Sequence, residues 1–239
     1  MPAGQDDDLV QKYEAADAHF FRAEEAFLKQ DFLTARSELA ECLKLMPEHS
    51  EAHYLLAQVN ARQGYYFRAL NHIAKAEDYY DFAVKIRGEQ QQRLLVELQR
   101  MRDEQESILA DLEKVLAHTS DASTRTTLES RILQARKIKT SIEDRLLSPR
   151  SSLSEGPAEY HEFHGEVLLR LKRYPEAETQ FRMAIRLAPT SPDAYEELAG
   201  MLLLTGHARI ARDVIDEAEA RGLTMDEKLK ESVLKALGK

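Results

Sequence analysis

The chain has 239 residues and a formal net charge of −9, and charged residues make up 31% of it. Nine glycines and seven prolines are few for this length, tryptophan is absent, and no run of 18 apolar residues occurs. This composition indicates an all-α fold and argues against a β-sandwich, a β-barrel or a membrane-spanning helix. The acidic first residues and the single cysteine, Cys42, favour a reducing, cytoplasmic location.

The charge is spread unevenly along the chain. Residues 1–84 carry −7 and residues 158–239 carry −3, whereas residues 85–148 carry +1. Binding to phosphates needs a clustered excess of Lys and Arg, and only residues 125–147, at +3, offer one. We therefore expect nucleic acid not to be the main partner. Docking on RNA or a membrane is kept as an alternative for the basic residues of that stretch, which are Arg125, Arg131, Arg136, Lys137, Lys139 and Arg145.

An internal repeat is the strongest pattern in the sequence. Residues 158–191 and 192–225 align without a gap at a period of 34 residues, so that Gly165 pairs with Ala199. In each segment apolar residues recur three and four apart in two runs separated by a turn, which predicts a helix, a turn and a second helix. Small residues stand where the helices approach closely, and large ones such as Phe181 fill the space between them.

This pattern resembles the tetratricopeptide repeat. The family favours a small residue at the eighth place, alanine at the twentieth and twenty-seventh, and proline near the thirty-second. The third repeat of the chain meets these preferences with Gly165, Ala177, Ala184 and Pro189, and the fourth with Ala199, Ala211 and Ala218, with Leu223 in place of the proline. The earlier segments 50–83 and 20–49 place Ala57, Gly64, Ala69 and Ala76, and Ala35, Leu39, Cys42 and Pro47, in the same register.

The resemblance implies an α-solenoid of helix-turn-helix repeats. We expect two repeats with a leading helix in residues 1–84, two more in residues 158–225, and a capping helix in residues 226–239. The first repeat lacks the usual glycine in its turn, so its first helix should be shifted by one residue. Before the fourth repeat, Ser191-Pro192-Asp193 predicts a helix start with a capping serine.

Residues 85–148 belong to no repeat and predict an inserted antiparallel coiled-coil hairpin, followed by a linker over residues 149–157. The helix before the insertion should run on unbroken from about residue 66 to residue 117, with a loop over residues 118–124. The first seam is expected at Leu94, Leu98, Met101, Ile108, Leu112 and Val115, interrupted at Gln105. The second is expected at Leu128, Ile132, Ala135, Ile142 and Leu146, with Lys139 off the pattern.

Residues that could support chemistry have simpler explanations. His161 and His164 flank Glu162, but they lack the spacing of a helical zinc site and should face the packed side of their helix, so we expect no metal. No phosphate-binding loop or nucleophile motif is present, and we predict neither an enzyme nor a cofactor. Cys42 should be buried and inert, and the serines of residues 150–154 are better explained as a polar tether than as phosphorylation sites.

The resemblance places the functional surface on the concave side, where the first helix of each repeat lines a groove that holds peptides in the family. The expected residues of the amino-terminal groove are Phe21, Glu25, Leu28, Tyr54, Gln58, Ala61 and Arg62. Those of the carboxy-terminal groove are Glu159, Glu162, Glu166, Leu169, Arg170, Asp193, Glu196, Glu197, Gly200 and Leu203. Family members that bind the acidic tails of chaperones use lysine and asparagine where this chain has Phe21, Glu25, Leu55 and Glu162, which disfavours that subclass.

The sequence therefore predicts a protein-binding adaptor or scaffold whose acidic groove prefers a basic or amphipathic segment of a partner protein. A structural role, in which copies of the chain form a homo-oligomer through the hairpin, is the main alternative. Whether the four repeats form one continuous array or two separate pairs is left open by the sequence.

Overall fold

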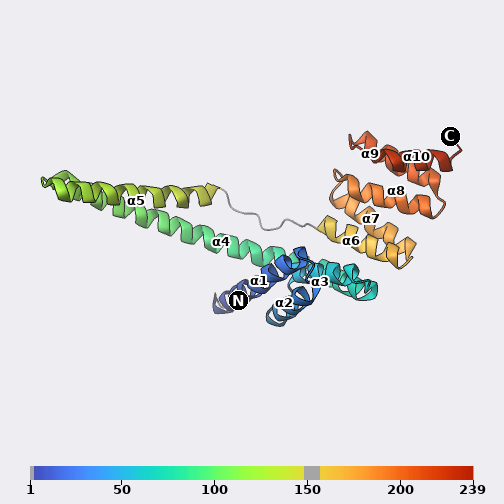
Figure 1. Ribbon diagram of the computed structural model, residues 1–239, viewed down its shortest axis with the longest axis horizontal. Coiled ribbons are helices and arrows are strands. Elements are labelled where there is room, and N and C mark those ends of the chain that lie inside the picture. Colours follow the sequence, from blue (N-terminus) through green and yellow to red (C-terminus); the bar gives the residue numbers. More distant parts are fainter. Residues whose placement is uncertain (1–2, 148–156, 239) are drawn as a thin grey trace. The chain divides into compact units, whose positions relative to one another are not determined.

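The computed structural model describes residues 3–147 and 157–238, which form helices and turns with no strand among them. No helix in these ranges is both long and apolar enough to cross a bilayer. The chain divides into a repeat unit, residues 1–84 and 153–239, and a hairpin unit, residues 85–152 (Figure 1). The helices are α1 (Ala3–Leu28), α2 (Phe32–Leu45), α3 (Ser50–Arg62), α4 (Tyr66–His118), α5 (Ala122–Leu147), α6 (Pro157–Arg170), α7 (Tyr174–Leu187), α8 (Pro192–Leu204), α9 (Ala208–Ala220) and α10 (Glu227–Ala236).

The repeat unit confirms the predicted all-α architecture of helix-turn-helix pairs. Helix α1 packs on α2, α6 on α7 and α8 on α9, and α10 covers α8 and α9 at the carboxy-terminal end. The second pair is formed by α3 and the first part of α4, up to Val84. The predicted leading helix is not separate from the first pair in the described residues. Helix α1, the first helix of that pair, is continuous from Ala3 to Leu28 and includes the segment expected to form the leading helix.

The turn between the two helices has the same backbone conformation in all four pairs. Gly64 and Gly206 have positive φ angles of 79° and 82°, and Gln30 and Lys172 occupy the same place in the first and third repeats with φ of 60° and 59°. The amide three residues after the helix end donates to a carbonyl five residues back in all four turns, for example Arg173 N to Leu168 O at 2.9 Å. This bond satisfies a helix-end carbonyl, so the turn needs a left-handed residue but not strictly a glycine.

The small residues of the repeat pattern mark close helix contacts. A Cβ placed on Gly165 of α6 would lie 2.6 Å from Cε1 of Phe181 on α7, which is nearer than real Cβ atoms come to any neighbour. Phe181 itself is fully buried and belongs to the core that α8 and α9 share. The glycine is therefore required by the approach of the two helices and not by a turn.

The hairpin insertion does not interrupt the packing of the repeats. Tyr54 of α3 stacks on Tyr160 of α6 with ring centroids 4.5 Å apart, and Tyr80 of α4 meets Tyr160 edge to face at 5.8 Å. Ser50 Oγ also lies 3.3 Å from Tyr160 Oη. Tyr54 and Tyr160 share one buried cluster with Ala57, Ala69, Ile73, Ala76 and Val167, and Tyr80 packs against it. The third repeat thus packs directly on the second, and the four repeats form one continuous array.

A buried polar cluster fixes α1 to the rest of the repeat unit. His49, which precedes α3, is fully buried, and its Nε2 lies 3.0 Å from Asp17 Oδ1 on α1. Its Nδ1 accepts a hydrogen bond from the amide of Ala52 at 3.2 Å and so caps α3. The Tyr13 ring stacks on the imidazole with centroids 4.6 Å apart. The side chain of His49 therefore caps the beginning of α3 and also holds α1 against it.

In the hairpin unit, α4 from Lys85 onward and α5 pack against each other as predicted. The predicted Leu98 and Leu112 lie on the seam of α4, but the other four predicted positions are displaced by one residue. Leu109 packs with Ile132 and Ala135 of α5, and Leu112 and Leu116 join them. The seam of α4 follows positions 98, 102, 105, 109, 112 and 116, which are all buried or half-buried. The four residues wrongly assigned to this seam, which are 37–53% exposed, are Leu94, Met101, Ile108 and Val115.

The seam of α5 agrees with the prediction at Leu128, Ile132, Ala135 and Ile142, all of which are buried. The half-buried Lys139 completes its spacing of three and four. The connecting loop is shorter than expected. Helix α4 runs to His118 and α5 begins at Ala122, because Asp121 caps α5 by accepting a hydrogen bond from the amide of Thr124 at 2.8 Å. The predicted linker, apart from Pro157, lies outside the described residues.

Candidate functional site

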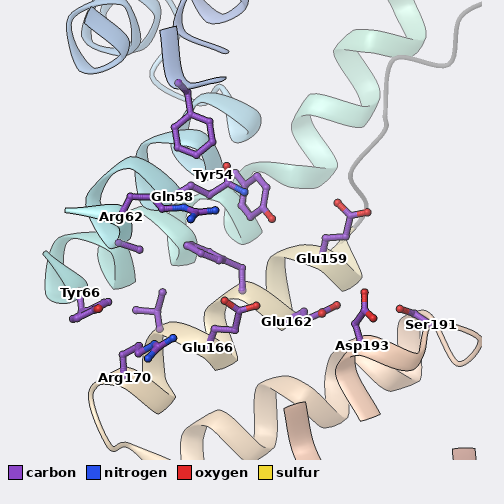
Figure 2. Close-up of a pocket in the computed structure, with 14 residues that line it drawn as sticks. Tyr54, Gln58, Arg62, Tyr66, Glu159, Glu162, Glu166, Arg170, Ser191 and Asp193 are labelled. Carbon is purple, nitrogen blue, oxygen red and sulfur yellow. The ribbon is translucent and has the colours of Figure 1, made fainter. Parts of the chain in front are cut away.

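The repeat unit contains a groove of about 620 Å³, lined mainly by the first helices of the repeats (Figure 2). Helices α3 and α6 form its long walls, and the beginning of α8 closes one end. This groove joins the two predicted grooves into one site, because α6 packs directly after the second repeat. The residues that line it are Phe27, Tyr54, Gln58, Ala61, Arg62, Tyr66, Glu159, Glu162, Phe163, Glu166, Val167, Arg170, Ser191 and Asp193.

Aromatic rings form the floor of the groove. Tyr54 meets Phe163 edge to face with centroids 5.7 Å apart, and the same tyrosine stacks on the buried Tyr160 beneath it. Phe27 and Tyr66 add two half-buried rings from α1 and the start of α4. Rings held by such contacts present a fixed apolar surface that loses little side-chain entropy when a ligand covers it.

Acidic side chains dominate one end of the groove. Glu159, Glu162 and Glu166 follow one another at intervals of three and four on α6, and Asp193 adds a carboxylate from the first turn of α8. None of these four carboxylates forms an ion pair or hydrogen bond within the described part of the chain. Four carboxylates of one sign with no cation in ion-pair contact leave a local excess of negative potential, which Arg170 and Arg62 reduce only at Glu166.

The pKa values of these groups reflect that crowding. Burial, followed by repulsion from Asp193, Glu166, Glu197 and Glu159, raises the pKa of Glu162 to about 7. Burial and Glu197 also raise the pKa of Glu166, against the opposing attraction of Arg170 and Arg62, and burial raises the pKa of Glu159. Protons, or an added cation, would therefore stabilise this end of the groove.

Two arginines stand at the other end of the groove. In Figure 2, Arg62 and Arg170 lie opposite Glu159 and Asp193, with Glu166 between them. Arg62 ends α3 and Arg170 ends α6, whereas Glu159 and Asp193 are in the first turns of α6 and α8. Acidic side chains are favoured at helix starts and basic ones at helix ends, and the first helices of the repeats run in the same direction. The groove is consequently acidic at one end and basic at the other.

The structure brings together nine of the residues expected in the groove. Tyr54, Gln58, Ala61, Arg62, Glu159, Glu162, Glu166, Arg170 and Asp193 all line it. Glu197 lies outside the lining but close enough to raise the pKa of Glu162 and Glu166. Glu196 has a structural contact instead, since its Oε1 accepts a hydrogen bond from the amide of Asp226, the cap of α10, at 2.8 Å.

The remaining expected residues are placed elsewhere. Phe21 and Leu28 are 56% and 81% exposed but do not line the groove, and Glu25 pairs with Lys29 at 2.6 Å. Leu169 and Leu203 pack against the core of the carboxy-terminal repeats, and Gly200, half-buried on α8, does not line the groove. The α1 side of the groove was predicted one residue out of register, because Phe27 faces it and Leu28 does not.

Five lining residues were not expected from the sequence: Phe27, Tyr66, Phe163, Val167 and Ser191. A one-residue change in the register of α1 would have found Phe27. Tyr66 belongs to a second helix, and Phe163 and Val167 lie at the edge of the apolar face of α6, where a repeat pattern reads them as core. Ser191 was expected to cap α8, yet its side chain forms no capping hydrogen bond and lines the groove instead.

The two histidines of α6 fasten the second repeat to the third. His164 Nδ1 lies 2.8 Å and His161 Nδ1 lies 3.1 Å from Glu77 Oε1 on α4. Burial would raise the pKa of Glu77, but the hydrogen bonds from both histidines lower it to about 2. In the described residues no group of three or more His, Cys, Asp or Glu side chains is arranged to hold a metal ion.

Three of the six basic residues considered for RNA or membrane docking already form contacts within the hairpin. Arg136 pairs with Glu113 at 2.8 Å, and Lys139 pairs with Glu106 at 3.1 Å. Arg125 donates to the carbonyls of Leu116 and Thr119 and so closes the end of α4. The three basic residues without such contacts are Arg131, Lys137 and Arg145. They are too few and too far apart in the sequence to form a clustered phosphate-binding face.

No protein-family model and no curated protein sequence matches the chain. Solved structures similar to it include the type IV pilus biogenesis factor PilW, at 16% identity and a TM-score of 0.41 over 94% of this chain and 86% of that one. PilF of Pseudomonas aeruginosa is 17% identical, with a TM-score of 0.37 over 95% and 90%. YrrB, a tetratricopeptide repeat protein with an unusual peptide-binding site, is 15% identical, with a TM-score of 0.30 over 92% and 91%.

Proposed function

We propose that the chain is a protein-binding adaptor whose groove takes a segment of a partner protein with a basic side chain at the acidic end. The observation that carries this proposal is the set of unpaired carboxylates Glu159, Glu162, Glu166 and Asp193 above an aromatic floor. A lysine or arginine placed there would relieve the repulsion that raises the pKa of Glu162, and its methylene groups would cover the rings.

The basic end of the groove indicates the orientation in which the partner segment binds. Neither Arg62 nor Arg170 forms an ion pair or hydrogen bond with another described residue. A carboxylate on the ligand, from an acidic side chain or a chain end, would complement these two guanidinium groups. We therefore infer that the preferred segment carries a basic residue toward α8 and an acidic one toward the carboxy-terminal ends of α3 and α6.

The proposed role is one of binding and not of catalysis. Groove residues that a partner could use are carboxylates, guanidinium groups and rings, which recognise charge and shape. The two histidines on α6, His161 and His164, do not line the groove and are engaged with Glu77. The cytoplasm, expected from the single cysteine, is part of this proposal.

A peptide array tests the proposal. Peptides that combine one Lys or Arg with an acidic residue at different spacings would be probed with the full chain and with Glu162→Lys and Glu166→Lys. We expect captured peptides to lose about tenfold or more in affinity with each variant, because a favourable charge contact becomes a repulsive one. Binding of the unmodified chain should strengthen from pH 6 to pH 8, since the pKa of Glu162 is about 7 and the ionised form attracts the cation.

Asp213→Lys is the matched control, because Asp213 is exposed on α9 and does not line the groove. It makes the same change in net charge and should leave every captured peptide bound. If the groove variants and the control behave alike, the carboxylates only keep the surface hydrated and the proposal is wrong.

A further inference from the structure

The two flanks of the helical hairpin differ in chemistry. On one flank, Arg136 of α5 pairs with Glu113 of α4 at 2.8 Å, and Lys139 pairs with Glu106 at 3.1 Å. In the heptad of the observed seam, Glu106 and Glu113 hold equivalent positions on α4, seven residues apart. This flank is therefore closed by ion pairs between the hairpin's own helices.

The opposite flank of α4 carries an apolar stripe that α5 does not cover. Leu94, Met101, Ile108 and Val115 follow one another at intervals of seven residues and are 46%, 37%, 40% and 53% exposed. They lie beside the seam that includes Leu98, Leu109 and Leu112, and not on it. On α5, Ile138 holds the equivalent flanking position and is 42% exposed. A stripe with heptad spacing has the pattern of a helix-packing seam without a partner helix.

Charged residues border this stripe with opposite signs on its two sides. On α4 each of the first three stripe residues is followed three positions later by an acid, which gives the row Glu97, Glu104 and Asp111. On α5 Arg131 and Arg145 lie seven residues to either side of Ile138, and both are exposed. The surface thus has an acidic edge, an apolar centre and a basic edge.

Such a surface is complementary to a second copy of itself. A twofold axis parallel to the hairpin places α4 of one copy against α5 of the other, so apolar centres meet and each acidic edge faces a basic edge. A twofold axis perpendicular to the hairpin would instead bring acidic edge to acidic edge. The charges select the parallel arrangement of two hairpins.

The size of the stripe suits a reversible association. From residue 94 to residue 115 it extends about 32 Å along α4 at 1.5 Å per residue. With the width of a helix pair, each copy would bury roughly 500–600 Å², which brings the total to the lower limit of specific interfaces. The partner needed to cover this stripe is therefore small, and a second hairpin has the matching length.

We propose that the hairpin is a self-association element in which two copies of the chain pair through this stripe as a parallel, four-helix arrangement. The inference is independent of the ligand proposed for the groove. Self-association explains why one flank of the hairpin is closed by ion pairs while the other exposes apolar side chains. A hairpin that acted only as a rigid spacer would not need an exposed apolar flank.

The mass of the full chain in solution tests this proposal. Sedimentation velocity over rising protein concentration should show the 27.3 kDa chain approaching twice that mass. The double substitution Met101→Glu with Ile108→Glu should keep it monomeric. Ser107→Glu with Ser130→Glu adds the same charge at exposed positions away from the stripe and should still dimerise. Equal helicity by circular dichroism shows that both variants are folded.

A charge exchange tests the orientation. One variant carries Glu104→Arg and Asp111→Arg, and the other carries Arg131→Glu and Arg145→Glu. Each alone should associate at least tenfold more weakly than the unmodified chain, because like charges then meet, and a mixture of the two should recover the dimer. A chain that stays monomeric at every concentration, a dimer indifferent to the Met101 and Ile108 changes, or a mixture that fails to recover would each overturn the proposal.

Discussion

The repeat unit and the hairpin unit are both helical, yet their helices are held together by different means. In the repeat unit the contacts depend on size, with Gly165 against Phe181 and Tyr54 stacked on Tyr160. In the hairpin the seam itself includes the half-buried Gln105 and Lys139, and charge pairs close one flank. The difference teaches that shape fixes the array, whereas charge and heptad spacing fix the hairpin and leave it less tightly packed.

The largest expected effect tests the role of shape in the repeat unit. Gly165→Ala places a methyl group 2.6 Å from the Phe181 ring, so α6 and α7 must move apart. We expect the free energy of unfolding to fall by about 2–3 kcal/mol, as is typical of overpacked cores. Urea denaturation followed by circular dichroism measures the change.

A matched glycine separates this effect from helix propensity. Gly200 on α8 has no atom within 4 Å of the position its Cβ would take. Gly200→Ala should therefore stabilise the repeat unit by up to about 1 kcal/mol, because alanine is the better helix former. If both substitutions change stability in the same direction, close approach at Gly165 is not what the small residue provides.

The contact between Gly165 and Phe181 could be predicted from the sequence because the same pattern of small and large residues occurs in more than one repeat. Ala199 stands at the place of Gly165 one period later, and Ile215 at that of Phe181, so small and large positions could be assigned before any helix was placed. The turns were harder to read. Gln30 and Lys172 adopt the left-handed conformation that glycine has in the other two repeats, and composition alone does not reveal such residues.

The second prediction concerns the polar residue in the hairpin seam. Gln105 lies between Leu98 and Leu112 on the seam of α4 and is half-buried. Gln105→Leu should stabilise the hairpin by about 1 kcal/mol, since the seam would become continuously apolar. Amide hydrogen exchange in α5 should slow by about fivefold, with no change in α8 or α9.

Ser107→Leu is the control for this prediction, because Ser107 is exposed on α4 away from the seam. It adds a comparable apolar side chain and should leave the exchange rates of α5 unchanged. Equal slowing by both substitutions would mean that general helix propensity, and not the seam, limits the stability of the hairpin.

The seam of α4 also shows where prediction from the sequence ended. Leu98, Gln105 and Leu112 fit two alternatives, completed either by Leu94, Met101, Ile108 and Val115 or by Leu95, Arg102, Leu109 and Leu116. The seam predicted from the sequence is the first set, which is the more apolar. The second is the true seam, since it lets Glu106 and Glu113 reach Lys139 and Arg136. Which side a neighbouring helix occupies is a tertiary fact that periodicity cannot supply.

The groove was predictable on α3, α6 and α8, where the repeat register is strict, and not on α1. The turn after α1 has no glycine, and the groove side of that helix is displaced by one residue, so Phe27 replaces Leu28. The polarity of the groove was not anticipated either. It depends on Arg62 and Arg170 ending helices that run in the same direction as those begun by Glu159 and Asp193.

The smallest expected effect concerns the stability of the repeat unit. It tests whether the buried carboxylate of Glu162 destabilises this unit, as the polar Gln105 is expected to destabilise the hairpin. The pKa of Glu162 is raised to about 7 in the folded chain from an ordinary 4.5. A carboxyl with a raised pKa binds its proton more tightly when folded, so stability increases as the pH falls from about 7 toward 4.5. Glu162→Gln removes the charge permanently and should be the more stable form wherever the glutamate is ionised.

At pH 8 we expect Glu162→Gln to raise the free energy of unfolding by roughly 1 kcal/mol, a value discounted for partial solvent screening. At pH 5 the two proteins should be nearly equal, because the glutamate is then largely protonated. Asp213→Asn, which removes an exposed charge on α9, should show no such pH dependence. A stabilisation that is the same at both pH values would come from packing and not from charge. A stabilisation confined to high pH, together with weaker peptide binding, would show that the carboxylate is destabilising to the fold and useful only to a ligand.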